Sequence, residues 1–214
     1  MKRIVVLASG RGSNLEALIA SIKAGSINGE IVCVISDYAD AIALYVARRD
    51  SIATAVVDAQ TNFFDSVHFE TALIDNIQKQ QPDLILLAGF MKILSPHFVE
   101  TFEGHILNIH PSLLPAYKGL DTHRRVLEAG EQLHGCSVHF VTSKLDDGPV
   151  IIQARVAVKE DDNPQTLAAR VLVQEHRIYP YATALFCEDR ITMQAEKCWL
   201  DNKILEHPLT KIPC

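Results

Sequence analysis

Short apolar runs and segments with helical spacing alternate along the first half of the chain. The apolar runs have the length of strands and stand at residues 3–8, 30–36, 51–57, 83–88 and 105–109. The spacing of amphipathic helices follows between them, at residues 15–25, 41–49 and 66–80 and in a short segment after Ser95-Pro96. This alternation builds βαβ units, so it predicts a mostly parallel open sheet with helices on both faces.

The pattern changes after residue 134. Residues 135–142 alternate between apolar and polar positions, and a second apolar run at 149–158 follows across a short polar stretch. This spacing predicts antiparallel strands near the C-terminal end, followed by a long helix over 164–186. We see no repeat or linker that divides the chain, so we expect a single α/β domain over residues 1–214.

Composition excludes several classes of partner. The chain has 214 residues, 48% of them hydrophobic and 21% charged, which is ordinary for a globular protein. A net charge of −6 without a basic face argues against nucleic acid. The longest apolar run, "LILLAGFM", is too short to span a membrane.

The five cysteines, at positions 33, 136, 187, 198 and 214, show no CxxC spacing. With an odd count and no secretory leader, they predict a reduced, cytoplasmic protein. His134 and Cys136 could share one face of a strand, but no second pair of ligands follows at a suitable spacing. We therefore expect no metal.

A glycine loop, "SGRGSN", joins the first predicted strand to the first helix. Gly10 and Gly12 allow a tight turn, after which the amides of Gly12, Ser13 and Asn14 could face an anion at the helix N-terminus. A plain turn with a serine or asparagine cap explains the same residues. The loop lacks GK[ST], and Leu15 replaces the third glycine of the dinucleotide fingerprint, so a monophosphate fits best.

The fifth apolar run ends in two polar side chains, Asn108 and His110. Side chains two apart on a strand point to the same side, and ligands of open α/β sheets bind at the carboxyl ends of strands. Each residue alone could simply cap the strand. In "LDDGPV", Asp146 could orient the imidazole, and the sequence leaves open whether Asp146 or Asp147 turns inward.

Several motifs together resemble the phosphoribosylglycinamide formyltransferases of purine synthesis. They are "LASGRGSNL", "LAGFMKILSPHFV", "LNIHPSLLPAYKGLDTHRRVLEAGEQLHGCSVHFVT", "LDDGPVI" and "QEHRIYP", spread over about residues 3–200. The resemblance implies the Rossmann-like formyltransferase fold. It also implies a ribotide-binding half over about 1–100 and a folate-binding, catalytic half over about 84–200.

The implied reaction transfers a formyl group from the co-substrate 10-formyltetrahydrofolate to the amine of glycinamide ribonucleotide, without a metal. The resemblance assigns the catalytic roles to Asn108, His110 and Asp146, with His110 as proton donor to a tetrahedral intermediate. It assigns ribotide binding to Gly12, Ser13, Asn14 and Glu175. It assigns folate binding to Met91, Lys92, Ile93, Leu94 and Asn108, with 142–146 as the other wall of that pocket.

Three positions depart from the family pattern: Arg11, Val67 and Asp147 stand where many members have asparagine, arginine and glycine. Val67 puts the outer folate contacts in question. Alternative functions are a methionyl-tRNA formyltransferase, a formyltetrahydrofolate hydrolase and a non-catalytic ribotide-binding module. The first two would normally carry an additional domain, and an intact triad argues against the third.

Overall fold

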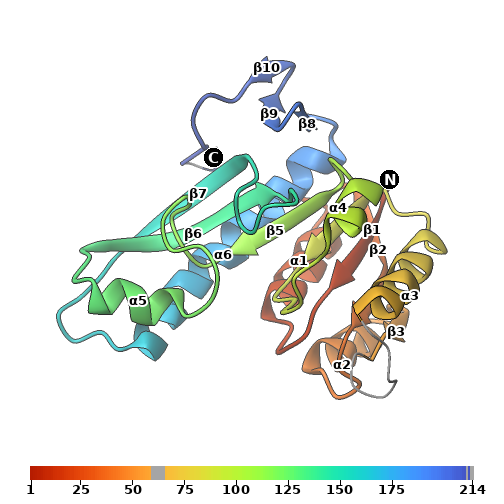
Figure 1. Cartoon of the computed structure of the whole chain (residues 1–214), viewed down its shortest axis with the longest axis horizontal. Helices are drawn as coiled ribbons and strands as arrows, with labels where there is room; N and C mark the ends of the chain where they lie inside the picture. The colour runs from red at the N-terminus through yellow and green to blue at the C-terminus, as the bar shows by residue number, and fades with distance from the viewer. Residues whose placement is uncertain (59–65, 211, 213–214) are drawn as a thin grey trace. The chain divides into compact units, whose positions relative to one another are not determined.

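The computed structural model describes residues 1–58, 66–210 and 212 (Figure 1). The chain divides into two compact units, Met1–Leu107 and Asn108–Cys214. The boundary falls inside one strand, β5 (Ile106–His110), whose first residues belong to the first unit and whose last residues belong to the second. The expected single domain over 1–214 remains a prediction.

The first unit is built on parallel strands. They are β1 (Lys2–Leu7), β2 (Gly29–Ser36), β3 (Thr54–Val56), β4 (Leu84–Leu87) and the start of β5, in the order β3-β2-β1-β4-β5. The residues Ile4–Leu7 at the centre are completely buried. A strand covered on both faces reads as a continuous apolar run, which is why these strands stand out in the sequence.

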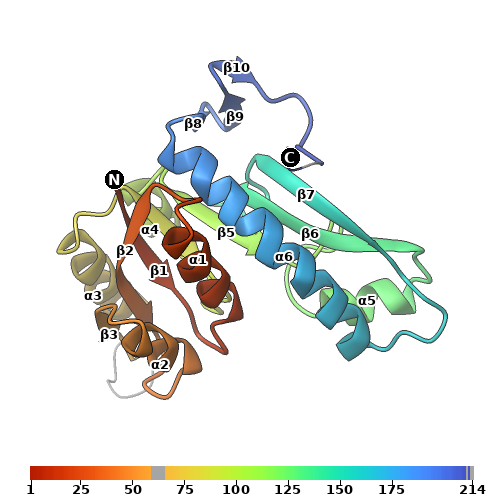
Figure 2. The ribbon, with the colours of Figure 1, turned by 180° about the vertical axis from the view of Figure 1, so that it is seen from behind.

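Helices cover both faces of these strands. They are α1 (Ser13–Lys23), α2 (Ile42–Arg49), α3 (Ser66–Gln78) and α4 (Pro96–Thr101). Right-handed crossovers place α1 and α2 on one face, and the reversal of direction after β3 places α3 and α4 on the other. Figure 2 shows α1 in front of β1 and β2. The predicted helices on both faces are confirmed.

The third strand is shorter than the predicted run at 51–57. Ser51 adopts a left-handed φ of 60°, and the N–H of Ile52 donates to the carbonyl of Ala47 over 2.9 Å. Residues 50–52 thus end α2 in a left-handed C-terminal turn instead of starting the strand. Ile52 belongs to the turn that ends the helix, so the predicted start of the strand at residue 51 is wrong.

The second unit carries the end of β5, then β6 (Leu133–Phe140) and β7 (Val150–Ala157), which pair antiparallel. Through β5 the hydrogen-bonded series runs over seven strands, ending in β5-β6-β7. The long helix α6 (Pro164–Cys187) packs along β6 and β7 (Figure 2), and the short helix α5 (Thr122–Glu128) contacts α6. The predicted antiparallel pair and long helix are confirmed.

The C-terminal segment adds a small antiparallel sheet that the sequence pattern did not predict. Its strands are β8 (Ile191–Gln194), β9 (Lys197–Leu200) and β10 (Lys203–Ile204). Beyond it, the Leu209 N–H donates to the carbonyl of Ile151 over 2.9 Å, and its carbonyl accepts from the Gln153 N–H over 2.8 Å. Leu209 therefore lies along the edge of β7.

Among the helices that the structure describes, none has the length and apolar character needed to cross a membrane.

Candidate active site

The end of β5 brings Asn108 and His110 together with Asp146. Nδ1 of His110 lies 3.5 Å from Oδ2 of Asp146, and both side chains are more than nine-tenths buried. Asn108 is half-buried on the same strand. The three residues to which the resemblance assigns catalytic roles thus form one cluster within the second unit.

Asp146 is the inward-facing aspartate of "LDDGPV". It adopts a left-handed φ of 48°, and its Oδ2 accepts the backbone N–H of Gly119 over 2.8 Å. Asp147 is 40% exposed at its side chain and forms an ion pair with Lys118. The hydrogen bond from Lys118 lowers the pKa of Asp147. Of the two aspartates between which the sequence left the choice open, the structure turns Asp146 inward and Asp147 outward.

A glycine is required directly after these aspartates. A Cβ on Gly148 would lie 1.8 Å from the carbonyl oxygen of Phe140. The residue after this glycine is bonded to the same place on β6, because the Phe140 N–H donates to the carbonyl of Pro149 over 3.1 Å. Any larger residue would push the aspartate loop away from β6, so the glycine sets the place of Asp146.

His139 is a member of this cluster that the sequence reasoning missed. Its Nδ1 lies 2.8 Å from the carbonyl oxygen of Phe140 and its Nε2 lies 3.1 Å from Nδ2 of Asn108. Because a carbonyl oxygen only accepts, Nδ1 carries the proton and Nε2 accepts one N–H of Asn108. Nε2 also lies 3.7 Å from Oδ1 of Asp146.

Burial lowers the pKa of His139 to about 4, so the ring is neutral at neutral pH. Only the neutral ring can accept the Asn108 amide hydrogen, so this neutrality fixes how the amide is turned. The ring holds one N–H of Asn108, and no residue that the structure describes accepts the other. The sequence signal was a histidine among the alternating residues of a predicted strand, which is equally typical of a buried structural residue.

The second nitrogen of His110 faces the backbone. Its Nε2 lies 3.0 Å from the carbonyl oxygen of Tyr117, which again can only accept. Nε2 therefore carries a proton, and Nδ1 faces the carboxylate of Asp146. When the ring carries both protons, each N–H has an acceptor. This arrangement suits a group that takes up and gives up protons.

The proline loop after β5 is anchored by Ser137, a completely buried residue of β6. Its hydroxyl donates to the carbonyl of Ser112 over 2.7 Å and accepts the N–H of Leu114 over 3.1 Å. The side chain of Gln153 also donates to this hydroxyl, over 2.9 Å. The loop therefore has a fixed path from His110 to Tyr117.

In the first unit, the glycine loop leads directly into α1. Gly12 is the N-cap, with a φ of 78° and no side-chain cap, so the alternative of a serine or asparagine cap is excluded. A Cβ on Gly12 would lie 2.8 Å from Cα of Ala43. Glycine is thus needed both for its φ and for the close approach to α2. The N–H groups of Ser13 and Asn14 are in the first turn, where helices have no internal acceptor.

Residues 91–94 follow β4 at the same edge of the first unit. The Met91 N–H donates to the hydroxyl of Ser9 over 2.9 Å, and the Ser9 N–H donates to the carbonyl of Gly89 over 3.1 Å. Two apolar side chains of the segment are open to solvent, Met91 at 63% and Ile93 at 79% exposure. Val67 lies in the first turn of α3 and is also exposed.

Glu175 lies on α6 in the second unit and is more than nine-tenths buried. It lies close enough to two other groups to affect their ionisation. Burial, with the Glu175 charge as a smaller cause, raises the pKa of the Cys136 thiol and that of the Tyr179 phenol. Cys136 is therefore a neutral thiol that faces a carboxylate.

His134, which is buried, and His123, which is partly buried, form an imidazole pair in this unit. Nε2 of His134 lies 3.0 Å from Nδ1 of His123, and the two rings pack edge to face. Burial is the main cause that lowers the pKa of His134 to about 4, and it also lowers the pKa of His123. Across residues 1–58, 66–210 and 212, no three histidine, cysteine or acidic side chains come together as a possible metal site.

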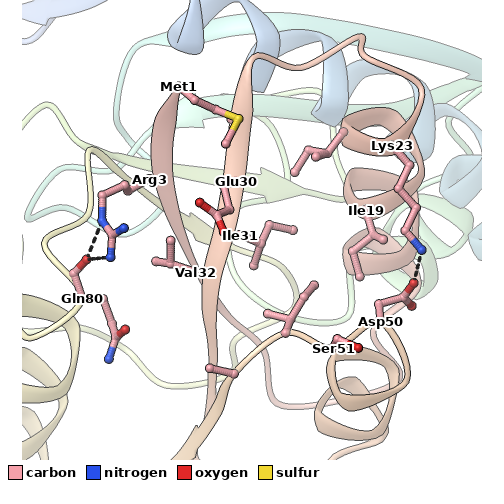
Figure 3. A pocket seen from close by; sticks show the side chains of 14 residues that line it. Met1, Arg3, Ile19, Lys23, Glu30, Ile31, Val32, Asp50, Ser51 and Gln80 are labelled. Carbon is pink, nitrogen blue, oxygen red and sulfur yellow. Dashed lines mark hydrogen bonds and ion pairs between the residues drawn. The ribbon is translucent and has the colours of Figure 1, made fainter.

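A cavity of about 600 Å³ in the first unit lies away from these residues (Figure 3). It opens at the amino-terminal edge of β1 and β2, where Arg3 donates to the carbonyl of Gln80 and Lys23 pairs with Asp50. Ligands of open α/β sheets bind at the opposite, carboxyl edge. None of the predicted site residues lines this cavity.

Comparison with known proteins shows the family of this chain. The formyl transferase family model matches residues 2–183. Phosphoribosylglycinamide formyltransferase of Escherichia coli strain K12 is 49% identical over 203 residues, which are 94% of this chain and 95% of the relative. The chain belongs to the phosphoribosylglycinamide formyltransferase family. The Haemophilus influenzae phosphoribosylglycinamide formyltransferase is 43% identical over 96% of each chain.

A solved phosphoribosylglycinamide formyltransferase, from Coxiella burnetii, has the same fold. It superposes with a TM-score of 0.93 and 44% identity over 99% of each chain. The prediction of a formyltransferase enzyme of purine biosynthesis and of its α/β fold is confirmed. The roles of individual residues in this formyltransferase remain predictions.

Proposed function

We propose that the chain transfers the formyl group from N10 of 10-formyltetrahydrofolate to the primary amine of glycinamide ribonucleotide. The products are formylglycinamide ribonucleotide and tetrahydrofolate. The observation that carries this proposal is the buried cluster of Asn108, His110 and Asp146 at the end of β5. The high identity to phosphoribosylglycinamide formyltransferases over nearly the whole chain supports it.

The first chemical step is attack of the free amine on the formyl carbon, which gives a tetrahedral intermediate with negative charge on its oxygen. Two N–H donors of the cluster suit that oxygen. One is the amide hydrogen of Asn108 that His139 does not hold, and the other is Nε2–H of His110. In other enzymes a donor of this kind contributes about 10²–10³ in rate.

Collapse of the intermediate requires a proton on the departing N10, while the attacking nitrogen, which carries an extra proton after the attack, must lose one. The proton that it loses restores the ring that protonates N10, so the reaction takes up no net proton. His110 is the proposed donor, through the proton on Nε2, so a substrate atom must take the place of the Tyr117 carbonyl as its acceptor. Asp146 faces the other nitrogen and stabilises the ring while it carries two protons. No covalent enzyme intermediate and no metal are part of the proposal.

Both substrates have fitting groups on the chain. We propose that the ribotide phosphate binds the amides of Gly12, Ser13 and Asn14 at the start of α1, helped by the helix dipole. Glu175 is proposed to contact the amino substrate. The exposed apolar side chains in the Met91–Leu94 segment suit the flat pterin of the folate, and Asn108 is proposed to contact its formyl group.

We expect the protein to act in the cytoplasm, with small molecules as its only partners in this reaction. The four cysteines that the structure describes are free thiols, which agrees with that compartment. Cys214 lies outside the described residues.

A comparison of acceptors tests the reaction. The enzyme is mixed with 10-formyltetrahydrofolate and, in separate reactions, glycinamide ribonucleotide, methionyl-tRNA or water alone. We expect rapid single turnover only with the ribotide. Faster transfer to methionyl-tRNA or to water would replace the proposal with one of the alternative functions. No turnover with any acceptor would favour a non-catalytic binding module.

Substitutions at the strand end test the roles. His110→Ala should lower kcat by about 10²–10⁴ with little change in either KM, because acid–base catalysis acts mainly on the transition state. Asn108→Ala should act in the same direction. The double variant should lose less than the product of the single losses, since the two groups act as a unit. A folded His110→Ala enzyme with a near-normal kcat would contradict the assignment.

A further inference from the structure

Both members of the His110–Asp146 pair are bonded to one short backbone segment. The carbonyl of Tyr117 accepts Nε2–H of His110 over 3.0 Å, and the N–H of Gly119 donates to Oδ2 of Asp146 over 2.8 Å. These two backbone groups stand two residues apart, in the segment Tyr117–Leu120. A shift of this segment would therefore change the surroundings of both side chains at once.

This segment has no regular structure of its own to hold it. Tyr117 has a left-handed φ of 55° and Gly119 one of 78°. A non-glycine residue in this conformation persists only where its surroundings enforce it, at a cost of about 1–3 kcal/mol. The position of the segment must then come from side chains that bind it from outside.

Arg125 is the main such side chain. Its Nη1 donates to the carbonyl of Lys118 over 2.7 Å and to that of Leu120 over 3.1 Å. The Lys118 carbonyl belongs to the same peptide group as the Gly119 N–H that reaches Asp146, so the guanidinium holds that peptide directly and also holds the segment two residues further on. The same guanidinium lies 5.4 Å from the centre of the Tyr117 ring, within reach of a cation–π contact.

Lys118 provides a second tether, toward the aspartate loop. Its ammonium group forms an ion pair with Asp147, the residue directly after Asp146. Both side chains are more than one-third exposed, so the pair by itself is weak. Its importance lies in its place, because it joins the segment to the loop that carries the catalytic carboxylate.

We propose that Arg125 and Lys118 are positioning residues for the His110–Asp146 pair and act through the segment Tyr117–Leu120. Neither residue needs to touch a substrate for this role. The inference rests on the proposed function, because it takes His110 and Asp146 as the groups that perform the chemistry. The geometry of His110 and Asp146 then depends on the guanidinium of Arg125, on the following helix α5.

A matched pair of neighbouring arginines tests the main tether. Arg125→Met removes both bonds to the segment and keeps the length of the side chain. Arg124→Met is the control, because Arg124 is exposed and pairs only with Asp121 and Glu128 among the partners that the structure describes. We expect Arg125→Met to lower kcat about 10–100-fold, with little change in either KM, since small misplacements of catalytic groups have effects of this size.

Equal kcat values for the two arginine variants, both folded, would overturn the proposal. So would a loss in Arg125→Met that appears only in KM. If Arg125→Met does not fold, Lys118→Met, Asp147→Asn and the double variant replace it. We expect each single variant to lose kcat by less than about tenfold and the double variant to lose no more than either one. Additive losses, or none, would overturn the role of this ion pair.

A measurement without turnover separates this inference from the proposed reaction. Nitrogen-15 NMR of the histidine rings reports the hydrogen bonding of each His110 ring nitrogen in the ligand-free protein. We expect the same His110 ring-nitrogen shifts in the unsubstituted protein and in Arg124→Met, and changed shifts in Arg125→Met, because the bonds from Tyr117 and Gly119 to the pair are altered. Unchanged His110 signals in folded Arg125→Met would overturn the inference even if the enzyme is active. The expected change in an enzyme without formyl transfer would contradict only the proposed function.

Discussion

Mild acid should destabilise the second unit, because two of its histidines are held neutral. Burial is the main reason that the pKa values of His134 and His139 lie at about 4, below the ordinary value of 6.5. As the pH falls from 6.5 to 4, the unfolded chain takes up a proton at each ring and the folded chain does not. The free energy of unfolding therefore falls with pH across this window, and these two groups change it no further below pH 4.

The loss of unfolding free energy can be worked out from the two pKa shifts. One pKa unit corresponds to about 1.4 kcal/mol, so at about pH 5, roughly 1.5 units below the ordinary pKa, each ring costs about 2 kcal/mol. The two together cost about 4 kcal/mol, a large part of the roughly 5–15 kcal/mol that stabilises a typical domain. Asp and Glu side chains with ordinary pKa values remain ionised at this pH and contribute little.

Urea unfolding at about pH 7.5 and pH 5, followed by tryptophan fluorescence, measures this loss. Trp199 on β9 is the single tryptophan and reports on the second unit. His134→Gln and His139→Gln should each reduce the loss by about 2 kcal/mol, and His123, whose pKa burial also lowers, adds to it in the same direction. The control is His97→Gln, at an exposed position on α4, which should leave the loss unchanged. An unsubstituted protein that is equally stable at both pH values would refute the reasoning.

Five further substitutions test three features of the site. Gly12→Ala should raise the KM for the ribotide and lower the melting temperature, because its Cβ meets Ala43. Gly10→Ala has open space around its Cβ and should change neither. If the two variants have the same KM for the ribotide, the loop is a plain turn. Asp146→Asn should cost orders of magnitude in kcat and Asp147→Asn less than about tenfold, and the reverse ranking would exchange their roles. His139→Phe should lower kcat by up to about 10²–10³, because the Asn108 amide loses its acceptor. An unchanged kcat in a folded variant would show that His139 does not orient the amide.

Much of the fold could be predicted because burial leaves a pattern in the sequence. Apart from the short and partly exposed β3, the strands of the first unit contain apolar runs because both of their faces are covered. The start of α6 was also readable, because Asn163 and Pro164 form an N-cap and a first turn. The small sheet β8–β10 was not, because its short strands mix charged and apolar residues and are only partly buried.

The site was predictable only where its groups are side chains with a fixed spacing. Asn108 and His110 lie two apart on a strand, so their common side followed from the geometry of β-structure. The inward turn of Asp146 depends on its own left-handed backbone, a conformation that an aspartate can adopt at either of the two positions, so the sequence could not choose between them. Tyr117 and Gly119 contribute a carbonyl and an N–H, which every residue has, so no residue type indicates them.

The bonds from Leu209 to β7 also bear on how the protein behaves at high concentration. A strand at the edge of a sheet presents unpaired N–H and C=O groups, on which strands of other molecules can assemble. In this protein, Leu209 of the same chain already bonds to the carbonyl of Ile151 and to the N–H of Gln153 on that edge. A shortened protein that lacks residues from 206 onward should therefore aggregate through this edge, even though every proposed catalytic group is still present.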